Sequence, residues 1–89
     1  MLRFAWKPEK NEWLKKERGI SFEQIENSIA TNGMKATLVN RVHPDQIVMV
    51  VDLDGYVVAV PATVSSKVVL LRTAYYSRKL NALYGGKKL

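Results

Sequence analysis

The sequence predicts a single α+β domain over residues 1–89, in which a curved antiparallel sheet packs on a helical hairpin. The first third of the chain has the apolar spacing and the capping residues of two short helices. From Lys35 onward the apolar residues alternate as they do in strands, and Asp54-Gly55 marks a tight turn between two of those strands. The expected order of elements is β-α-α-β-β-β-β-α.

The chain is expected to begin with a short strand and a helix. Apolar and other residues alternate over residues 2–6, which is typical of a half-buried strand. Pro8 suits the first position of a helix, and Gly19 suits the position just after its end. A charged helix over residues 9–18 follows from these two signals, with Glu12 and Lys16 expected to form an i,i+4 ion pair.

A second helix is predicted directly after the first. Ser21 and Gln24 have the spacing of a capping box at its start, and Asn32-Gly33 ends it. Phe22, Ile25 and Ile29 fall on one face, so this helix has an apolar stripe to bury.

Four strands and a last helix complete the prediction. The strands are expected over residues 36–42, 47–53, 56–64 and 68–73. Asp54-Gly55 predicts a type I′ turn between the second and the third of these strands. Pro61 lies within the third strand, where it favours a bulge or an edge position. Ser77 is expected to cap the last helix, which places Leu80, Leu83 and Tyr84 on one face before Gly85-Gly86 ends it.

Composition excludes several classes of site. The chain has no cysteine and one histidine, which rules out disulfides, thiol nucleophiles and zinc–thiolate centres, and no metal site or cofactor is expected. We expect a cytoplasmic protein without a membrane segment, because no apolar stretch is long enough to span a bilayer. The net charge of +6 is typical of nucleic-acid binding and would equally suit an acidic protein partner.

The most informative segment is residues 72–79, Arg-Thr-Ala-Tyr-Tyr-Ser-Arg-Lys, which directly follows the most apolar strand. Guanidinium groups, aromatic rings and hydroxyls are the groups that bind phosphate oxygens and unstacked bases. The plainer interpretation is that Arg78 and Lys79 open a solvated helix and that a tyrosine packs on the core. Tyr75 and Tyr76 are adjacent, so we expect one to face the core and the other to face solvent. Trp6 and Trp13 are both expected in the core.

The remaining polar residues can support metal-free cleavage of RNA. The RNA supplies the nucleophile, its 2′-hydroxyl, and the protein must orient it, stabilise the phosphoryl oxygens and transfer protons. Arginine suits the charge that develops on phosphorus, and a lysine can act as a base only if its pKa is depressed. His43 has the side chain best suited to proton transfer, but His43-Pro44-Asp45 is typical of a surface turn.

Two sets of motifs then point to a family. The chain opens with Phe4-Ala5-Trp6-Lys7-Pro8-Glu9-Lys10, followed by Leu14 and by Arg18-Gly19-Ile20-Ser21-Phe22-Glu23. It continues with Asp54-Gly55-Tyr56, Val60-Pro61, Leu71-Arg72-Thr73 and Ser77-Arg78-Lys79. These segments resemble a divergent branch of the BrnT family, small toxins of bacterial type II toxin–antitoxin pairs that are akin to the RelE ribonucleases. The resemblance extends over residues 4–84.

The resemblance implies a RelE-like fold with a β-α-α-β-β-β-β core and a terminal helix. It also implies RNA cleavage that blocks translation and growth, and neutralisation by a cognate antitoxin. By position, Lys10 matches the lysine that closes the family's Trp-x-x-x-Lys motif, and Arg72, Ser77, Arg78 and Lys79 match its C-terminal cluster. The chain departs from the family at its opening, where the usual Asp, Asn and His are Lys7, Trp13 and Arg18. It departs again at the end, where Leu70 and Tyr75 replace two arginines.

These inferences give a set of candidate residues and two classes of function. The candidate catalytic residues are Lys10, Arg72, Tyr75, Tyr76 and Arg78, and the candidate RNA-binding residues are Arg41, His43, Ser77 and Lys79. The expected partners are RNA and an acidic antitoxin from a neighbouring gene, in a hetero-oligomer. The alternative is a non-catalytic basic module of the same fold that binds RNA or an acidic protein. A third interpretation is a structural subunit whose open sheet edge recruits a partner strand.

Overall fold

The computed structural model describes residues 3–85, and over these residues it confirms an α+β domain. Its elements are β1 (Arg3–Ala5), α1 (Pro8–Arg18), α2 (Phe22–Asn32), β2 (Ala36–Val39), β3 (Gln46–Leu53), β4 (Tyr56–Ser65), β5 (Val68–Leu71), β6 (Tyr75–Tyr76) and α3 (Arg78–Tyr84). The order agrees with the predicted one, with the two-residue β6 added. Residue 2 of the predicted first strand and residues 86–89 lie outside the described part of the chain.

The sheet is mixed, so the expectation of an antiparallel sheet is wrong at one edge. The strand order is β1-β5-β4-β3-β2, and β6 pairs with β4 beyond the end of β5. β1 runs parallel to β5, whereas the other pairs are antiparallel. The reason is the long path between them: the helical hairpin and three strands separate β1 from β5, and no short turn dictates an antiparallel approach.

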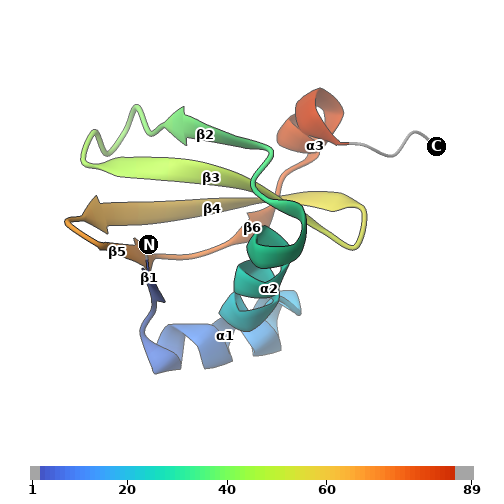
Figure 1. Ribbon diagram of the computed structural model, residues 1–89. Coiled ribbons are helices and arrows are strands. Elements are labelled where there is room, and N and C mark those ends of the chain that lie inside the picture. The colour runs from blue at the N-terminus through green and yellow to red at the C-terminus, as the bar shows by residue number, and fades with distance from the viewer. Residues whose placement is uncertain (1–2, 86–89) are drawn as a thin grey trace.

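The helical hairpin covers one face of the sheet (Figure 1). The core cluster between them contains Leu14, Ile20, Phe22 and Ile25 from the hairpin, and alternate residues of the strands: Met49, Val51, Val58, Val60, Ala62, Val69 and Leu71. The predicted stripe on α2 is thus confirmed, with Phe22 and Ile25 fully buried and Ile29 packed against the cluster. This packing fixes α1 beside the β1–β5 edge of the sheet.

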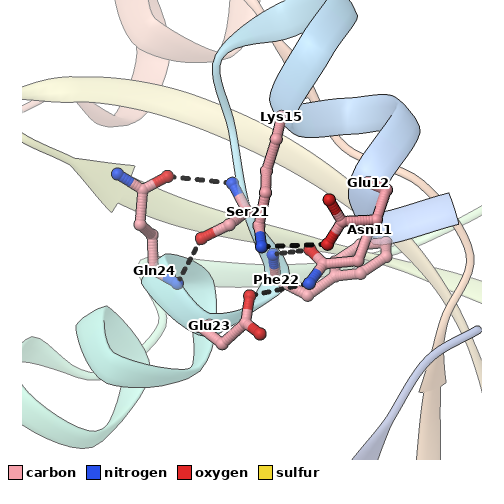
Figure 2. A network of polar contacts seen from close by, with 7 residues as sticks. All are labelled: Asn11, Glu12, Lys15, Ser21, Phe22, Glu23 and Gln24. Carbon is pink, nitrogen blue, oxygen red and sulfur yellow. Dashed lines mark hydrogen bonds and ion pairs between the residues drawn. The ribbon is translucent and has the colours of Figure 1, made fainter. Parts of the chain in front are cut away.

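A polar joint sets the angle between α1 and α2, as Figure 2 shows. Asn11 is only 4% exposed; its Oδ1 accepts the Phe22 N–H at 2.8 Å, and its Nδ2 donates to Glu23 Oε1 at 2.7 Å. Gly19 ends α1 in the left-handed conformation, with φ 67°, and the predicted capping box of Ser21 and Gln24 is present. The first helix is therefore held in one orientation relative to the second.

The ion pair predicted on α1 has a different partner. Lys15 Nζ lies 3.1 Å from Glu12 Oε2, at i,i+3 spacing, so the expected pairing of Glu12 with Lys16 is wrong. Both spacings bring side chains together on a helix. The i+3 partner is the one used here.

The β3–β4 hairpin confirms the strongest turn signal and explains Pro61. Asp54 and Gly55 have φ values of 53° and 89°, as a type I′ turn requires. Pro61 lies in the central strand β4, so it is not at an edge. On that side β4 pairs with β5 over residues 62–65 and with β6 over residues 58–59, and Pro61 falls in the gap between them. Its missing N–H therefore breaks no ladder, although its carbonyl accepts the Arg72 N–H at 2.9 Å.

Two predicted strands are too long. β2 ends at Val39 because the Asn40 Oδ1 accepts the N–H groups of Val42 and His43, each at 3.0 Å, which turns the chain out of the sheet. β5 ends at Leu71, where the chain bends before it resumes pairing as β6.

The last helix, α3, packs on the sheet face opposite the hairpin (Figure 1). Ser77 caps it as predicted, with its Oγ accepting the Leu80 N–H at 3.1 Å, and Asn81 Oδ1 accepts the Val57 N–H at 3.0 Å. Of the three residues predicted on one face of this helix, Leu80 and Tyr84 are half-buried, whereas Leu83 is 67% exposed. Over the described residues, none of the helices has the length and apolar character needed to cross a membrane.

Candidate nucleic-acid interface

A pocket of about 220 Å³ opens where β5 ends and α1 begins. It is lined by Lys7, Lys10 and Arg72, together with Leu70 and Leu71. The parallel register of β1 and β5 explains this meeting. Ala5 lies opposite Leu70, so Lys7, two residues further on, comes beside Arg72. The pocket thus brings together Lys10 and Arg72, two of the predicted catalytic residues.

The pocket is strongly cationic and has no carboxylate in its lining. Across residues 3–85, the ion pair that forms joins Lys15 to Glu12, so none of the three pocket cations is neutralised in this way. Glu9, in the first turn of α1, is exposed and is not part of the lining. Lys7 is the N-cap residue of α1, and its side chain makes no cap bond. The positive end of the α1 dipole is directed at the pocket. An anion bound here would relieve the mutual repulsion of these charges.

Trp13 lies beside the pocket on the outer side of α1, and the prediction that it belongs to the core is wrong. The side chains of α1 that turn inward are Asn11 and Leu14, whereas Trp13 is 42% exposed. Lys10 Nζ lies 4.2 Å from the centre of the Trp13 ring, and Arg18 Cζ lies 4.8 Å from it. Such contacts at exposed sites contribute about 0.5–1 kcal/mol each. Trp6, in contrast, packs on Phe22 and the core as predicted, with ring centres 5.5 Å apart.

Arg18 ties the end of α1 to the segment that links β5 and β6. Its Nη1 donates to the Ala74 carbonyl at 2.8 Å and contacts Thr73 Oγ1 at 3.3 Å. Because Ala74 is fully buried in the core, this guanidinium is attached to a rigid part of the backbone. The cationic surface that results, here called the pocket face, consists of Lys7, Lys10, Trp13, Arg18 and Arg72.

Tyr75 and Tyr76 form β6, and the expectation that one of them faces the core is wrong. They are 43% and 50% exposed, and as neighbours in a strand they point to opposite faces of the sheet. Tyr76 pairs with Val58, a residue of the hairpin side, and contacts the Tyr56 ring edge-on at 5.7 Å. Tyr75 pairs with Ala59 and lies on the α3 side.

Ser77, Arg78 and Lys79 lie in the α3 layer, and the structure does not place them in the pocket. The Ser77 hydroxyl is engaged as the helix cap, and Arg78 and Lys79 are exposed in the first turn of α3. Together with Tyr75 the two cations form a second cationic surface, here called the α3 face.

Arg41 and His43 lie elsewhere again. Both are exposed in the connection between β2 and β3, at the far edge of the sheet from β1 and β5. The structure therefore does not bring these two predicted RNA-binding residues to the pocket. Nor does the described part of the chain contain a cluster of three His, Cys, Asp or Glu side chains that could hold a metal ion.

Comparison of the chain with protein-family models, with curated proteins and with solved structures finds no match. The resemblance to BrnT toxins therefore rests on the motifs in the sequence and stays a prediction.

The pocket face can bind a phosphodiester and an adjoining base. Lys7, Lys10 and Arg72 offer the charge-assisted hydrogen bonds that phosphate oxygens favour, and Trp13 offers an aromatic ring next to them. Sequence reasoning found Lys10 and Arg72 and missed Lys7, Trp13 and Arg18. A signal for these three was present, because they are the positions where the opening departs from the BrnT pattern, each toward a cation or an aromatic residue.

Proposed function

We propose that this chain is the toxin of a type II toxin–antitoxin pair, with a RelE-like fold, and that it cleaves RNA without a metal ion. The observation that carries the proposal is that Lys10 and Arg72 line one pocket although they come from opposite ends of the chain. Lys10 belongs to the N-terminal BrnT-like motif and Arg72 to the C-terminal one, whose other matching residues, Ser77, Arg78 and Lys79, lie outside the pocket.

The pocket supports a simple division of labour. Arg72 would pair its guanidinium with the phosphoryl oxygens of the scissile phosphate, and Lys7 and Lys10 would offset the negative charge that grows as the 2′-hydroxyl attacks phosphorus. That attack forms a cyclic phosphate and breaks the bond to the 5′-oxygen. The 2′-hydroxyl loses a proton and the 5′-oxygen gains one, and Lys10 is the candidate carrier, because no tyrosine lines the pocket.

One observation favours a second candidate, a non-catalytic module that binds RNA. The pocket lining contains no histidine, aspartate or glutamate, so it offers no side chain that ordinarily accepts a proton near neutral pH. His43, the sole histidine of the chain, lies at the opposite edge of the sheet.

A cleavage assay tests the proposal and separates it from this alternative. Purified chain, free of any antitoxin, is incubated with RNA in the presence of EDTA, and the products are resolved on a denaturing gel. We expect cleavage by the wild type, loss of cleavage in the Lys10→Ala/Arg72→Ala variant, and full activity in Lys16→Ala. Lys16 is a matched control because it is an exposed lysine of the same helix outside the pocket lining. RNA that is bound but recovered intact would favour the non-catalytic module.

The same proposal includes an acidic antitoxin encoded beside this chain. Exposed ion pairs are weak and screened at physiological ionic strength, so such a partner must also bury an apolar element to neutralise the pocket face. Co-expression of the neighbouring gene product should restore growth, and the two chains should co-purify. Growth arrest that no neighbouring gene relieves would count against a toxin–antitoxin pair.

A further inference from the structure

The Trp13 ring is an exposed aromatic surface in a strongly cationic setting. It is 42% exposed, on the side of α1 that faces away from α2 and the core. Two cations, Lys10 and Arg18, lie over it. These two contacts each contribute little at an exposed site, and they leave Trp13 42% exposed. The arrangement therefore suggests a ligand that is both aromatic and anionic.

The two cations differ in how firmly they are held. Arg18 donates hydrogen bonds to the Ala74 carbonyl and to Thr73 Oγ1, so it stays where it is. Lys10 has its contact with the Trp13 ring, and within residues 3–85 its ammonium makes no hydrogen bond or ion pair. Arg18 is thus a fixed cation and Lys10 a movable one.

Lys10 also connects the ring to the phosphate pocket. Lys10 lines the pocket with Lys7 and Arg72, so its long side chain can turn from the ring toward a phosphate bound there. That movement would uncover the ring for a base from the same nucleic acid. The exchange is favourable because a base stacked on an aromatic side chain gains more free energy than an exposed cation–π contact.

We infer that Trp13 is a stacking platform for a base of single-stranded RNA, bound next to a phosphate in the pocket. This inference rests on the proposed function and adds to it the class of substrate and a residue that selects it. A duplex cannot use the platform, because its bases are already stacked on one another, whereas an unpaired base can leave its neighbours and lie on the ring. Arg18 would hold the ring in place from its fixed position.

Calorimetric titration with a base-free control tests the inference. The probe is a short 2′-O-methyl oligouridylate, which cannot be cleaved through its own 2′-hydroxyl, and the control ligand is inorganic polyphosphate, which has charge but no base. Trp13→Ala should weaken oligouridylate binding about tenfold, the loss typical of one base–aromatic stack. It should leave polyphosphate binding unchanged, and Trp13→Phe, which keeps a ring, should bind the oligomer nearly as well as the wild type does.

Tryptophan emission gives a second readout that a purely structural role would not produce. The chain has two tryptophans, and Trp6 is packed on Phe22. The oligomer should therefore quench the emission of the wild type through Trp13, and this quenching should disappear in Trp13→Phe although binding persists.

The outcomes separate the inference from the proposed function. Equal oligomer affinity in wild type and Trp13→Ala would overturn the inference, and so would an equal loss for polyphosphate. Polyglutamate that perturbs the Trp13 emission as strongly as the oligomer does would also overturn it, in favour of an acidic protein partner. RNA cleavage by the wild type that continues unchanged in Trp13→Ala would leave the proposed function standing without the platform. A wild type that neither binds nor cleaves RNA would remove both.

Discussion

The two cationic surfaces of this domain are assembled in opposite ways. The α3 face comes from one short segment, residues 75–79, whereas the pocket face joins α1 to the residue that follows β5. Tyr75 and Tyr76 are neighbours in sequence, yet they point to opposite faces of the sheet, and the turn into α3 carries the next residues into another layer. Residues from the two ends of the chain, in contrast, meet through the parallel β1–β5 pair. Proximity in sequence is therefore a poor guide to a shared site here.

The comparison makes its strongest prediction for RNA affinity. Lys10→Ala/Arg72→Ala removes two charge-assisted hydrogen-bonding groups from the pocket face and should lower RNA affinity by at least about a hundredfold, since each such bond contributes about 1.5–3 kcal/mol. The slope of log affinity against log salt should become shallower by about 1.4, or about 0.7 for each phosphate that the variant no longer neutralises.

The matched control for that experiment is Arg78→Ala/Lys79→Ala, which removes the same net charge from the α3 face. Its RNA affinity should fall by no more than about threefold, as expected for the loss of long-range attraction alone. Filter binding at several salt concentrations measures both variants. Equal losses in the two would show that the RNA contacts both surfaces and that the pocket face is not a separate site.

A second prediction concerns what holds the pocket face in place. Asn11→Ala leaves the buried Phe22 N–H without its acceptor and frees the α1–α2 joint. The free energy of unfolding should fall by about 2–3 kcal/mol, the usual cost of an unsatisfied buried donor together with the missing bond to Glu23. Urea unfolding followed by circular dichroism measures the change, with Asn27→Ala, an exposed position on α2, as the control. A loss equal to that of the control would mean that Asn11 does not fix the joint.

A smaller loss of stability is expected from changing Asn81, the asparagine of α3 that accepts a backbone N–H. Asn81 accepts the Val57 N–H but is only half-buried, so water can replace it in part. Asn81→Ala should cost about 1 kcal/mol of stability and leave the RNA affinity of the pocket unchanged. If RNA affinity fell as stability did, the two surfaces would be coupled through the sheet.

Most of the fold could be predicted because its signals are local. Gly19, the capping box of Ser21 and Gln24, and the Asp54-Gly55 turn each act over a few residues, and the structure confirms all of them. The position of β1 could not be predicted in this way, since parallel pairing across a long connection leaves no mark on the local pattern. The early end of β2 depends on a single side-chain acceptor, Asn40, which propensity does not reveal.

The site was predictable in part for the same reason. Lys10 and Arg72 stood out from the motifs, and the register of β1 with β5 was needed to show that they share a pocket. Trp13 was misplaced because large aromatic side chains are on average highly buried. Asn11, a polar residue, takes the inward position in this helix instead. Arg41 and His43 were included for their chemistry alone, and chemistry does not say at which edge of a sheet a residue lies.

The smallest predicted effect is a dependence of the unfolding free energy on acidic pH, which comes from Glu23 at the α1–α2 joint. The pKa of Glu23 lies below its ordinary value of 4.5, chiefly because the Asn11 side chain donates to its carboxylate, with further help from its own backbone N–H and from Lys15. The folded state therefore binds this proton less readily than the unfolded state does. The stabilisation is fully present above pH 4.5 and is lost as the pH falls through the lower pKa of the folded state.

Glu23→Gln should remove this dependence, so that its unfolding free energy falls less than that of the wild type on acidification below pH 4.5. Asn11→Ala should move the Glu23 pKa back toward its ordinary value, which a carboxyl-carbon NMR titration measures directly. Asn81→Ala is the matched control, because its side chain accepts from a backbone N–H and does not touch this carboxylate. A Glu23 pKa that is the same in Asn11→Ala and in Asn81→Ala would show that the carboxylate is held by the helix end and by Lys15, and that the α1–α2 joint owes its rigidity to the Phe22 bond alone.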